Sequence, residues 1–254
     1  MVSLILAAGY ATRLGKLTRD KPKALLPIGG KLIIDYLLDD MAALPGLSDV
    51  YVVSNHKFIG AFNGWRDGLI ARNAYPGLNV HVLDDGSTDD DNKRGAVGDI
   101  QFVIESAAID EELLIAAGDN FFTFPLRAFY DDFVSHGHDT LCATPISDTD
   151  LLRSFAVATL DSKRRVTGLI EKPDKPQSDI AVYALYLYRR DTLPLVGEYL
   201  AQGYSPDSPG RFPEWLHRRK EVRAYLFQGE CYDIGTPAAY EEVTRRFARG
   251  KPKV

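Results

Sequence analysis

The sequence predicts an α/β protein with a Rossmann-like three-layer αβα fold, in which helices cover a mixed, mostly parallel central sheet. Short apolar runs alternate with longer stretches of helical period, which is typical of strands joined by crossover helices. The runs at residues 50–53 and 113–117 have no polar face, as expected of central strands covered on both sides. After about residue 145 the pattern changes to alternating strands, which indicates antiparallel additions in the C-terminal half.

The predicted elements follow from the local spacing of apolar residues. Continuous apolar runs predict strands at residues 2–7, 50–54, 79–83, 112–117 and 139–144. Apolar residues at helical spacing predict helices at residues 31–44, 57–72, 96–108, 125–136, 189–202 and 237–249. Alternation of apolar and polar residues predicts further strands at residues 156–160, 166–170 and 180–188. These last three strands are the expected antiparallel additions.

The length and composition indicate a globular chain. It has 254 residues, of which 45% are hydrophobic and 26% charged, close to the average of folded domains. At about 150 residues per domain, one large domain or two small ones would fit. No linker rich in Pro, Gly or Ser separates the two halves. We therefore predict a single domain over residues 1–254, with 1–145 and 146–254 as its halves.

The charge and cysteine content exclude several classes of partner. Lys and Arg number 30 against 35 Asp and Glu, a net charge of −5, so no broad positive field is present for a nucleic acid. No apolar run approaches the ~18–20 residues that cross a bilayer, and no membrane association is expected. Residues 2–8 are apolar without a preceding basic stretch, which favours a buried strand over a signal peptide. Cys142 and Cys231 have no disulfide or metal spacing, so both are expected as reduced thiols in the cytoplasm.

The first predicted strand runs into a loop that carries the strongest functional signal. The loop reads Leu6-Ala7-Ala8-Gly9-Tyr10-Ala11-Thr12-Arg13-Leu14-Gly15, and Lys21-Pro22-Lys23-Ala24-Leu25-Leu26-Pro27 follows. Small residues at the carboxyl end of a parallel strand turn backbone N–H groups toward the crevice where such folds bind ligands. Arg13, Lys21 and Lys23 add positive charge to the same connection. We therefore predict a cradle for a polyphosphate.

Two common phosphate motifs do not fit this loop. The Walker motif requires G-x-x-x-x-G-K-[ST], but Gly9 and Gly15 enclose five residues and no hydroxyl residue follows Lys16. The dinucleotide fingerprint requires glycine at its third and sixth positions, where Ala11 and Leu14 stand. Both motifs are excluded by the spacing.

Residues 6–27 resemble the first signature of the sugar-1-phosphate nucleotidylyltransferases, the family of glucose-1-phosphate thymidylyltransferase and its uridylyl and cytidylyl relatives. That signature is similar to L-A-(A/G)-G-x-(G/A)-T-R-L followed by K-P-K-x-L-x-P. Three further blocks occur in the family's order, namely Gly118-Asp119-Asn120, Glu171-Lys172-Pro173 and Tyr232-Asp233-Ile234-Gly235-Thr236-Pro237. Together the blocks extend from residue 4 to about 242, nearly the whole chain.

The resemblance implies an enzyme that transfers a nucleotidyl group. An oxygen of a sugar 1-phosphate attacks the α-phosphorus of a nucleoside triphosphate (NTP), pyrophosphate leaves, and an NDP-sugar forms. The chemistry must bring two polyanions together end-on, so cations and their carboxylate ligands are expected in the site. A phosphate monoester, with a second pKa of about 6, is already largely dianionic at neutral pH and needs no general base. The implied cofactor is Mg²⁺, and a homo-oligomer is compatible with the family.

The resemblance also implies roles for individual residues. Catalytic contacts to phosphate groups are implied for Arg13, Lys23 and Lys172. The implied magnesium ligands are Asp119 and Asp233, since two carboxylates with phosphate oxygens suit this ion. Nucleotide contacts are implied for Leu6, Ala7, Ala8, Gly9, Thr12, Gly95 and Asp119. Sugar-phosphate contacts are implied for Glu171, Lys172, Phe155, Ala156 and Val182. The nucleotide is thus expected in the half formed by residues 1–145 and the sugar phosphate in 146–254.

Two regions depart from the family's pattern and leave the substrates open. In the stretch expected beside the nucleobase, Ala96 replaces threonine and Asp99 replaces a small residue, so base preference does not carry over. On the sugar side, residues 155–157, 182–184 and 210–216 differ from the usual motifs, so the acceptor is open as well. Within 210–216, Arg211 and Trp215 are candidates for acceptor contacts, although the apolar spacing there equally fits a packed helix face.

Three different functions remain open from the sequence. A cytidylyltransferase for a non-sugar phosphate such as phosphocholine has a nearly identical first block. A non-catalytic nucleotide-binding regulatory protein would keep the site without turnover. Asp89-Asp90-Asp91 satisfies the D-x-D motif of glycosyltransferases that consume nucleotide sugars, although those enzymes lack the first block. The acidic run at residues 84–91 is otherwise typical of a solvated loop.

Overall fold

The computed structural model describes residues 1–248, apart from the side chains of Thr12, Arg13, Lys16 and Asp233. The chain forms two compact units, each assembled from separate stretches of sequence. The first unit comprises Met1–Lys93, Ala116–Arg127 and the chain from Gly229 onward. The second unit comprises Arg94–Ile115 and Ala128–Gln228.

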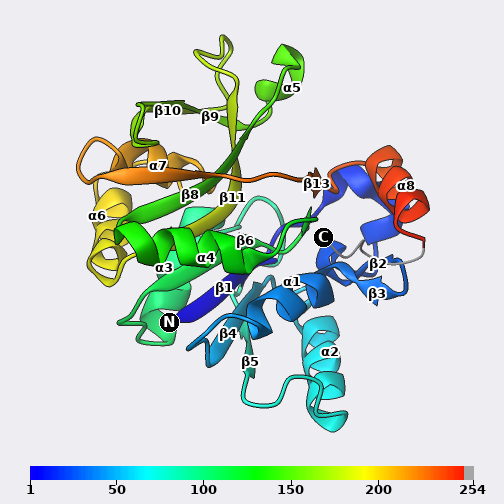
Figure 1. Ribbon diagram of the computed structural model, residues 1–254. Coiled ribbons are helices and arrows are strands. Elements are labelled where there is room, and N and C mark those ends of the chain that lie inside the picture. Colours follow the sequence, from blue (N-terminus) through cyan, green and yellow to red (C-terminus); the bar gives the residue numbers. More distant parts are fainter. Residues whose placement is uncertain (249–254) are drawn as a thin grey trace. The chain divides into compact units, whose positions relative to one another are not determined.

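Parallel strands form the frame of the first unit (Figure 1). The strands are β1 (Val2–Leu6), β4 (Asp49–Ser54) and β5 (Asn79–Asp84). β4 pairs with β1 on one side and β5 on the other, both in parallel register. Its residues Val50, Val52 and Val53 are fully buried, as expected of a strand with two neighbours and two covered faces. The helices are α1 (Ile33–Ala42) and α2 (Ile59–Ala71), of which α2 packs against β5.

A second group of short elements in the first unit builds the surroundings of the N-terminal loop. These are the 3₁₀ segments η1 (Thr12–Thr18) and η2 (Lys23–Leu25), the strands β2 (Pro27–Ile28), β3 (Lys31–Leu32), β7 (Asn120–Phe122) and β13 (Cys231–Asp233), and the helix α8 (Pro237–Arg246). Gly29 and Gly30 both have positive φ, as a two-residue hairpin between β2 and β3 requires. β13 pairs with β7 in antiparallel register.

An apolar cluster packs these short elements against one another. Phe121 lies at its centre, with ring centroids 4.8 Å from both Tyr36 of α1 and Phe247 after α8. Leu14 and Ile234 are buried in the same cluster. Edge-to-face aromatic contacts of this kind add to the free energy of apolar burial. The cluster therefore fixes the N-terminal loop relative to the segments that follow β7 and β13.

The second unit holds further strands, most of them in antiparallel pairs. They are β8 (Asp139–Pro145), β9 (Ala156–Leu160), β10 (Val166–Glu171), β11 (Ile180–Tyr188) and β12 (Val222–Leu226). β11 pairs antiparallel with β8 and β9, β9 pairs antiparallel with β10, and β12 joins β8 in parallel. β6 (Leu113–Ala117) and α4 (Leu126–His136) each cross from one unit into the other along the chain. The remaining elements are α3 (Ala96–Ser106), α5 (Thr149–Leu152), η3 (Arg190–Thr192), α6 (Leu193–Ala201) and α7 (Arg211–Leu216).

The structure confirms the predicted α/β class with a mixed sheet and antiparallel additions in the C-terminal half. The helix predicted at residues 189–202 is divided into η3 and α6 because Pro194, at the start of α6, has no N–H to continue the preceding turn. The short elements α5, β7, β12 and β13 were not predicted from apolar spacing, whereas α7 is the packed helix expected from the spacing of Phe212, Trp215 and Leu216, all of which are buried. No helix within residues 1–248 is long and apolar enough to cross a membrane.

One buried carboxylate, that of Asp139, links β8 to two other segments of the second unit. Asp139, at the start of β8, is completely buried. Its carboxylate accepts hydrogen bonds from the Arg189 N–H at 2.7 Å and the Thr192 hydroxyl at 2.8 and 2.9 Å, and Lys220 Nζ lies 3.2 Å away. Burial raises the pKa of this carboxyl, and the hydrogen bonds and the Lys220 charge oppose that shift. Arg189, Thr192 and Lys220 therefore stabilise the charged form of the Asp139 carboxyl.

Replacing Asp139 with alanine should lower the free energy of unfolding by about 3–5 kcal/mol, because the Arg189 N–H and the Thr192 hydroxyl lose their acceptor and Lys220 loses its buried counter-charge. Urea denaturation measures the loss. The matched control is Asp110→Ala, which removes the exposed partner of Arg190 and should leave the urea midpoint near that of the wild type. Equal midpoints for the two variants would contradict a structural role for Asp139.

Candidate functional site

The turn that follows β1 is held by hydrogen bonds to its backbone. The Ala7 N–H donates to the Val53 carbonyl at 3.0 Å, and Asn55 Nδ2 donates to the Ala8 carbonyl at 2.8 Å. Asn55 is fully buried, and its Oδ1 accepts from the Phe58 N–H at 3.0 Å. No heavy atom of the described residues lies within 4 Å of the position that a Cβ on Gly9 would occupy. The turn is therefore rigid, and its glycine faces open space that a ligand can approach.

The loop continues through a strained residue into η1. Ala11 has φ 48° and ψ 38°, a left-handed conformation that costs a non-glycine residue free energy. The Thr18 hydroxyl donates to the Ala11 carbonyl at 2.9 Å, and the Leu14 N–H donates to the same oxygen at 3.1 Å. The side chains of Thr12 and Arg13, which the sequence assigns to the nucleotide, lie outside the described residues.

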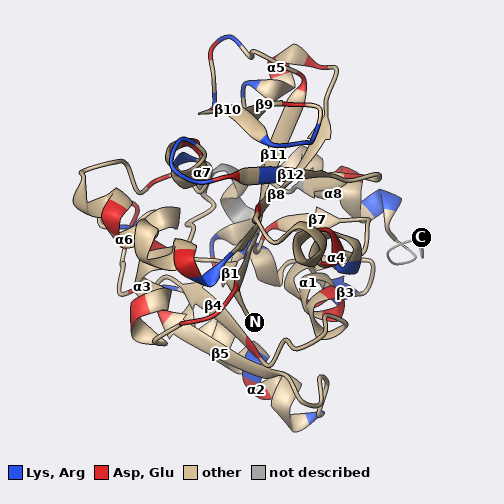
Figure 2. Ribbon diagram, turned by 60° about the vertical axis from the view of Figure 1, so that its left-hand side comes forward, with Lys and Arg blue, Asp and Glu red and all other residues tan. Residues whose placement is uncertain are grey.

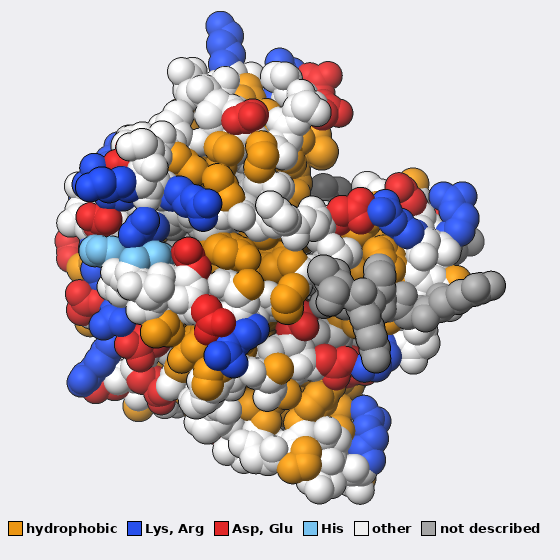
Figure 3. All heavy atoms as spheres, in the orientation of Figure 1, with side chains coloured by type: hydrophobic (Ala, Val, Ile, Leu, Met, Phe, Trp, Pro, Cys, Tyr) orange, Lys and Arg blue, Asp and Glu red, His pale blue; other side chains and the backbone are white. Residues whose placement is uncertain are grey.

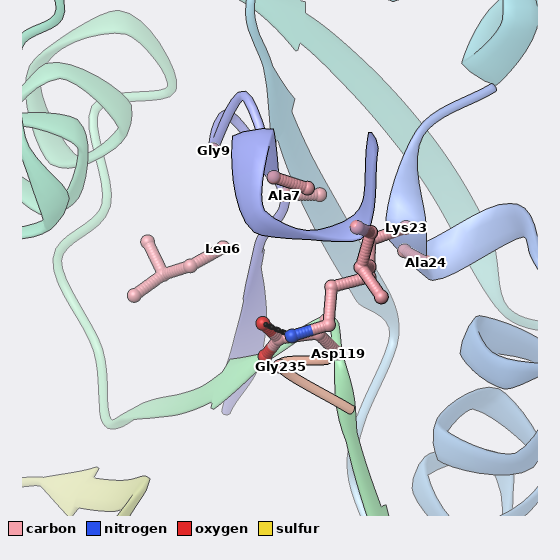
Figure 4. Close-up of a pocket in the computed structure, with 10 residues that line it drawn as sticks. Leu6, Ala7, Gly9, Lys23, Ala24, Asp119 and Gly235 are labelled. Carbon is pink, nitrogen blue, oxygen red and sulfur yellow. Dashed lines mark hydrogen bonds and ion pairs between the residues drawn. The ribbon is translucent and has the colours of Figure 1, made fainter. Parts of the chain in front are cut away.

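Lys23 and Asp119 meet in the cavity beside this loop. Lys23 Nζ lies 2.7 Å from Asp119 Oδ2, and the two side chains are 11% and 35% exposed. Figure 4 shows the ammonium and the carboxylate pointing toward one another, with Gly235 close by. η2 directs Lys23 inward, because the next residue, Ala24, is buried and fixes the short turn. The structure thus joins a predicted catalytic residue to a predicted metal ligand.

A glycine allows the close approach of Asp119. A Cβ on Gly118 would lie 3.0 Å from Ile5 Cγ2 and 3.1 Å from the Leu6 carbonyl oxygen, both closer than ordinary contact. The Gly118 N–H donates to that same Leu6 oxygen at 2.9 Å. A larger residue would push this strand end away from β1. The G-D-N block therefore depends on its glycine for packing.

The cavity has a volume of about 210 Å³. Its lining residues are Leu6, Ala7, Gly9, Ala11, Leu14, Lys23, Ala24, Gly118, Asp119 and Gly235. Of the residues assigned to the nucleotide, Leu6, Ala7, Gly9 and Asp119 line it, together with Lys23, whereas Ala8 is buried at 7% exposure and is not in the lining. Small side chains leave the backbone accessible, as a phosphate cradle requires.

The donor set is compatible with a hard cation. The Asp119 carboxylate opens to the cavity, and carboxylate oxygens are preferred ligands of Mg²⁺, which usually keeps several waters. In the pairing of β13 with β7, Asp233 stands opposite Asn120, the residue after Asp119. The side chain of Asp233 lies outside the described residues. Among the residues that the structure describes, no group of three or more His, Cys, Asp or Glu could hold a metal ion by itself.

A second cluster of predicted residues lies within the second unit. Glu171 of β10 is paired with Ala156 of β9, and Ala156 is paired in turn with Val182 of β11. Lys172 follows Glu171, and its Nζ lies 3.6 Å from Glu171 Oε1. Phe155 contributes its carbonyl oxygen, which accepts from the Lys172 N–H at 3.0 Å. The structure therefore brings all of the residues assigned to the sugar phosphate together.

The turn at Lys172 is strained and anchored. Lys172 has φ 50°, a left-handed conformation that the surrounding contacts must impose. Glu214 of α7 supplies one of these contacts, since its Oε2 accepts from the Glu171 N–H at 3.1 Å. Glu214 carried no motif signal in the sequence, apart from its place in a departing segment. It holds the end of β10, and with it the orientation of Glu171 and Lys172.

Glu171 is a buried acid in this cluster. Its exposure is 7%, and burial raises the pKa of its carboxyl, while the charges of Lys172 and Arg211 and a hydrogen bond with Ser208 act in the opposite direction. A Cβ on Gly210 would lie only 2.0 Å from Glu171 Oε2. Glycine at 210 is therefore required for Glu171 to keep its position.

Gly95, which the sequence assigns to the nucleotide, packs tightly against another segment of its own unit. Gly95 belongs to the second unit, and a Cβ there would lie 2.6 Å from the Pro206 carbonyl oxygen, so it packs against the segment before α7.

Within the acidic run at residues 84–91, Asp89 and its neighbours are exposed, but Asp85 is buried at 2% exposure. The Ser87 N–H and hydroxyl both donate to Asp85 at 2.7 Å. The expectation of a fully solvated loop is therefore wrong at Asp85, because Ser87 compensates its buried charge.

The comparisons with known proteins agree with these features. The chain belongs to the nucleotidyl transferase family, whose sequence model matches residues 2–250. A Sulfolobus acidocaldarius protein named as a mannose-1-phosphate guanyltransferase is 27% identical over 258 residues, which cover 98% of this chain. The chain spans 66% of the length of that relative.

Solved structures share the fold. A Bacillus anthracis protein named as a glucose-1-phosphate thymidylyltransferase, in complex with sucrose, matches with a TM-score of 0.80 at 20% identity, over 100% of this chain and 98% of that one. UDP-glucose pyrophosphorylase matches without ligand at TM-score 0.81 and 19% identity, over 97% of both chains. Its complex with UDP-glucose matches at TM-score 0.80 and 20% identity, again over 97% of both chains. The match to the nucleotidyl transferase family confirms the resemblance drawn from the sequence blocks, and the solved structures show the same fold.

The raised pKa of Glu171 predicts a pH-dependent stability difference between the wild type and Glu171→Gln. The folded state binds the Glu171 proton more tightly than the unfolded chain, so the stabilising contribution is present below the unfolded pKa and lost as pH rises through the folded one. Glutamine has no such titration. Denaturant unfolding from pH 4 to 8 should therefore show the variant gaining stability relative to the wild type as pH rises. Glu198→Gln, at the exposed face of α6, is the matched control for removing one charge, and a wild type that gains on Glu171→Gln instead would contradict the prediction.

Proposed function

We propose that the protein transfers a nucleoside monophosphate from an NTP to a sugar 1-phosphate and releases pyrophosphate. The observation that carries the proposal is the Lys23–Asp119 pair at 2.7 Å in a cavity lined by the small-residue loop. Such a pair offers a cation to a phosphate group and a carboxylate to a metal ion. Phosphoryl chemistry of this kind depends on positioning and charge stabilisation more than on a nucleophilic side chain.

The first unit is proposed to bind the NTP. The open face of Gly9 and the backbone N–H groups of its turn suit a polyphosphate. Lys23 would transfer its hydrogen bond from Asp119 to an α-phosphate oxygen, where negative charge develops as pyrophosphate departs. Arg13 is proposed for the outer phosphates. Asp119 and Asp233 would hold Mg²⁺, which would supply charge neutralisation for the phosphate oxygens.

The second unit is proposed to bind the acceptor. The ammonium of Lys172, with a side chain 56% exposed, is accessible to a phosphate group. The Glu171 carboxylate beside it can accept hydrogen bonds from sugar hydroxyls. These hydrogen bonds would offset part of the free-energy cost of burying the carboxylate. This carboxylate would also attract the quaternary ammonium of a choline phosphate, so the screen below includes both kinds of acceptor.

A glycosyltransferase and a non-catalytic binding protein have weaker support. For a glycosyltransferase, the D-x-D aspartates should be available to a metal ion, but Asp89 Oδ1 accepts from the Asp91 and Asn92 N–H groups at 3.0 and 3.1 Å and so caps its own loop. For a non-catalytic binding protein, no specific observation on the described residues counts in its favour. The cytoplasmic location, the homo-oligomer and the single domain with halves at 1–145 and 146–254 stay predictions from the sequence.

A screen for pyrophosphate release tests the proposed function. Purified protein with Mg²⁺ is offered ATP, GTP, CTP, UTP and dTTP, each with sugar 1-phosphates or amino-alcohol phosphates. Release is expected with a sugar 1-phosphate. Lys23→Ala and Asp119→Ala should each lower kcat by about 10²- to 10³-fold in a protein that still folds, which circular dichroism checks. Lys31→Ala, an exposed lysine of the same unit that pairs with Asp39, is the matched control. Full turnover in Lys23→Ala or Asp119→Ala would refute the assigned roles.

Gly210→Ala should impair use of the acceptor alone. The new Cβ would displace the Glu171 carboxylate by more than an ångström, and misplacements of this size reduce rates by roughly 10- to 100-fold. Steady-state kinetics should show this fall in kcat/KM for the sugar phosphate, with KM for the NTP unchanged. Gly64→Ala, whose Cβ meets no described atom within 4 Å, is the matched control. Normal acceptor kinetics in Gly210→Ala would remove Glu171 from the acceptor site.

A further inference from the structure

A cavity that the proposed function does not use lies between the end of α6 and the helix α7. Its volume is about 420 Å³. Its lining residues are Tyr199, Gly203, Tyr204, Ser205, Arg211, Glu214, Trp215, Arg218 and Arg219. All of them belong to the second unit. The volume falls within the range of about 300–1,000 Å³ that is usual for small-molecule sites.

One wall of the cavity is aromatic and held in place. The Tyr199 hydroxyl donates to the Ser205 carbonyl at 2.6 Å. The Tyr204 ring stacks on Tyr199 with centroids 5.2 Å apart and planes 17° apart. Tyr204 is nevertheless 47% exposed, so part of this residue remains accessible to a ligand. Trp215, 5% exposed, closes the wall with its ring centroid 5.7 Å from that of Tyr199.

The other wall carries guanidinium groups. The Arg219 guanidinium stacks on the Trp215 ring at 3.8 Å and donates to the Trp215 backbone carbonyl at 3.3 Å. These two contacts with Trp215 fix the position of the guanidinium. Arg218 pairs with no carboxylate among the residues that the structure describes. Arg211 lies 3.6 Å from Glu214, the single acid in the described lining. Figure 2 shows Lys and Arg along α7 and the segment after it, and Figure 3 shows them on the surface there.

The cavity is therefore net positive in a chain whose net charge is −5. Guanidinium groups match phosphate oxygens in paired hydrogen bonds. An accessible tyrosine ring provides a stacking surface for a planar base. An inorganic anion would use only the arginines, and a neutral sugar would leave their charge unused. Only a ligand with both a flat ring and a phosphate uses the two walls together.

We propose that this cavity binds a nucleoside phosphate as a second ligand, separate from the NTP of the first unit. The base lies on Tyr204, and the phosphates contact Arg218 and Arg219. This site goes beyond the proposed function, and its existence does not depend on turnover. Arg211 and Glu214 join it to the acceptor cluster, because Glu214 also accepts from the Glu171 N–H. A phosphate that attracts Arg211 away from Glu214 would alter the surroundings of Glu171.

Tryptophan fluorescence tests the binding. The chain has two tryptophans, so Trp65→Phe leaves Trp215 as the only emitter. GDP and UDP are titrated separately into this variant, with excitation at 295 nm, and inorganic phosphate is the comparison probe. A saturable change in emission is expected with the nucleotides. Arg218→Glu should weaken the apparent affinity by more than about tenfold, the loss expected for a charged hydrogen bond. Arg153→Glu, at the exposed end of α5, should leave the affinity unchanged.

Each result decides the proposal. No saturable change with either nucleotide, or equal affinity in Arg218→Glu and the parent, overturns it. Inorganic phosphate that binds as tightly as the nucleotides also overturns it, because the aromatic wall would then contribute nothing. Equal melting temperatures for Arg218→Glu and Arg153→Glu show that a loss of binding is local. A shift in KM for the sugar phosphate at saturating nucleotide is the kinetic readout, which rests on the proposed function, whereas the fluorescence titration does not.

Discussion

The ion pair between Lys23 and Asp119 is the interaction on which the first unit's cavity depends. It joins two segments that are 96 residues apart in sequence, and each charge would otherwise face a low-dielectric wall of alanine, leucine and glycine. A half-buried charge without a partner is costly, so the pair holds the empty site in a defined geometry. In the proposed reaction, a phosphate group would replace Asp119 as the partner of Lys23, and a cation would replace Lys23 as the partner of Asp119.

Much of this site could be predicted because its chemistry is local in sequence. Lys23 lies in a seven-residue block whose prolines fix the turn, and Asp119 follows directly on a buried strand. Residues that act through packing gave no comparable signal. Asn55 is an ordinary strand-end residue in the sequence, and only the fold shows that its amide holds the Ala8 carbonyl. The same is true of Gly210, whose importance lies in the atom it lacks beside Glu171.

The fold itself was predictable where apolar period and length agreed, as in β4, β6 and α1. Prediction failed for short elements such as α5 and β13, whose few residues make no complete period and whose conformation depends on contacts distant in sequence. The division into two compact units was not predictable for a related reason. The chain leaves the first unit at residue 94, returns at 116 and returns again at 229, and no change of composition marks these crossings.

In the second unit, the candidate acceptor cluster contains features that oppose stability. Lys172 adopts a left-handed conformation, Glu171 is buried with a raised pKa, and both are kept in place by α7 rather than by β10 alone. A sequence selected only for stability would place an apolar residue at 171 and a glycine at 172. The helix that carries this constraint also carries Arg211 and the wall of the second cavity. A ligand that shifts α7 by a fraction of an ångström would therefore move Glu171 and Lys172 of the acceptor cluster first. Strained and desolvated groups keep their positions only through the contacts around them.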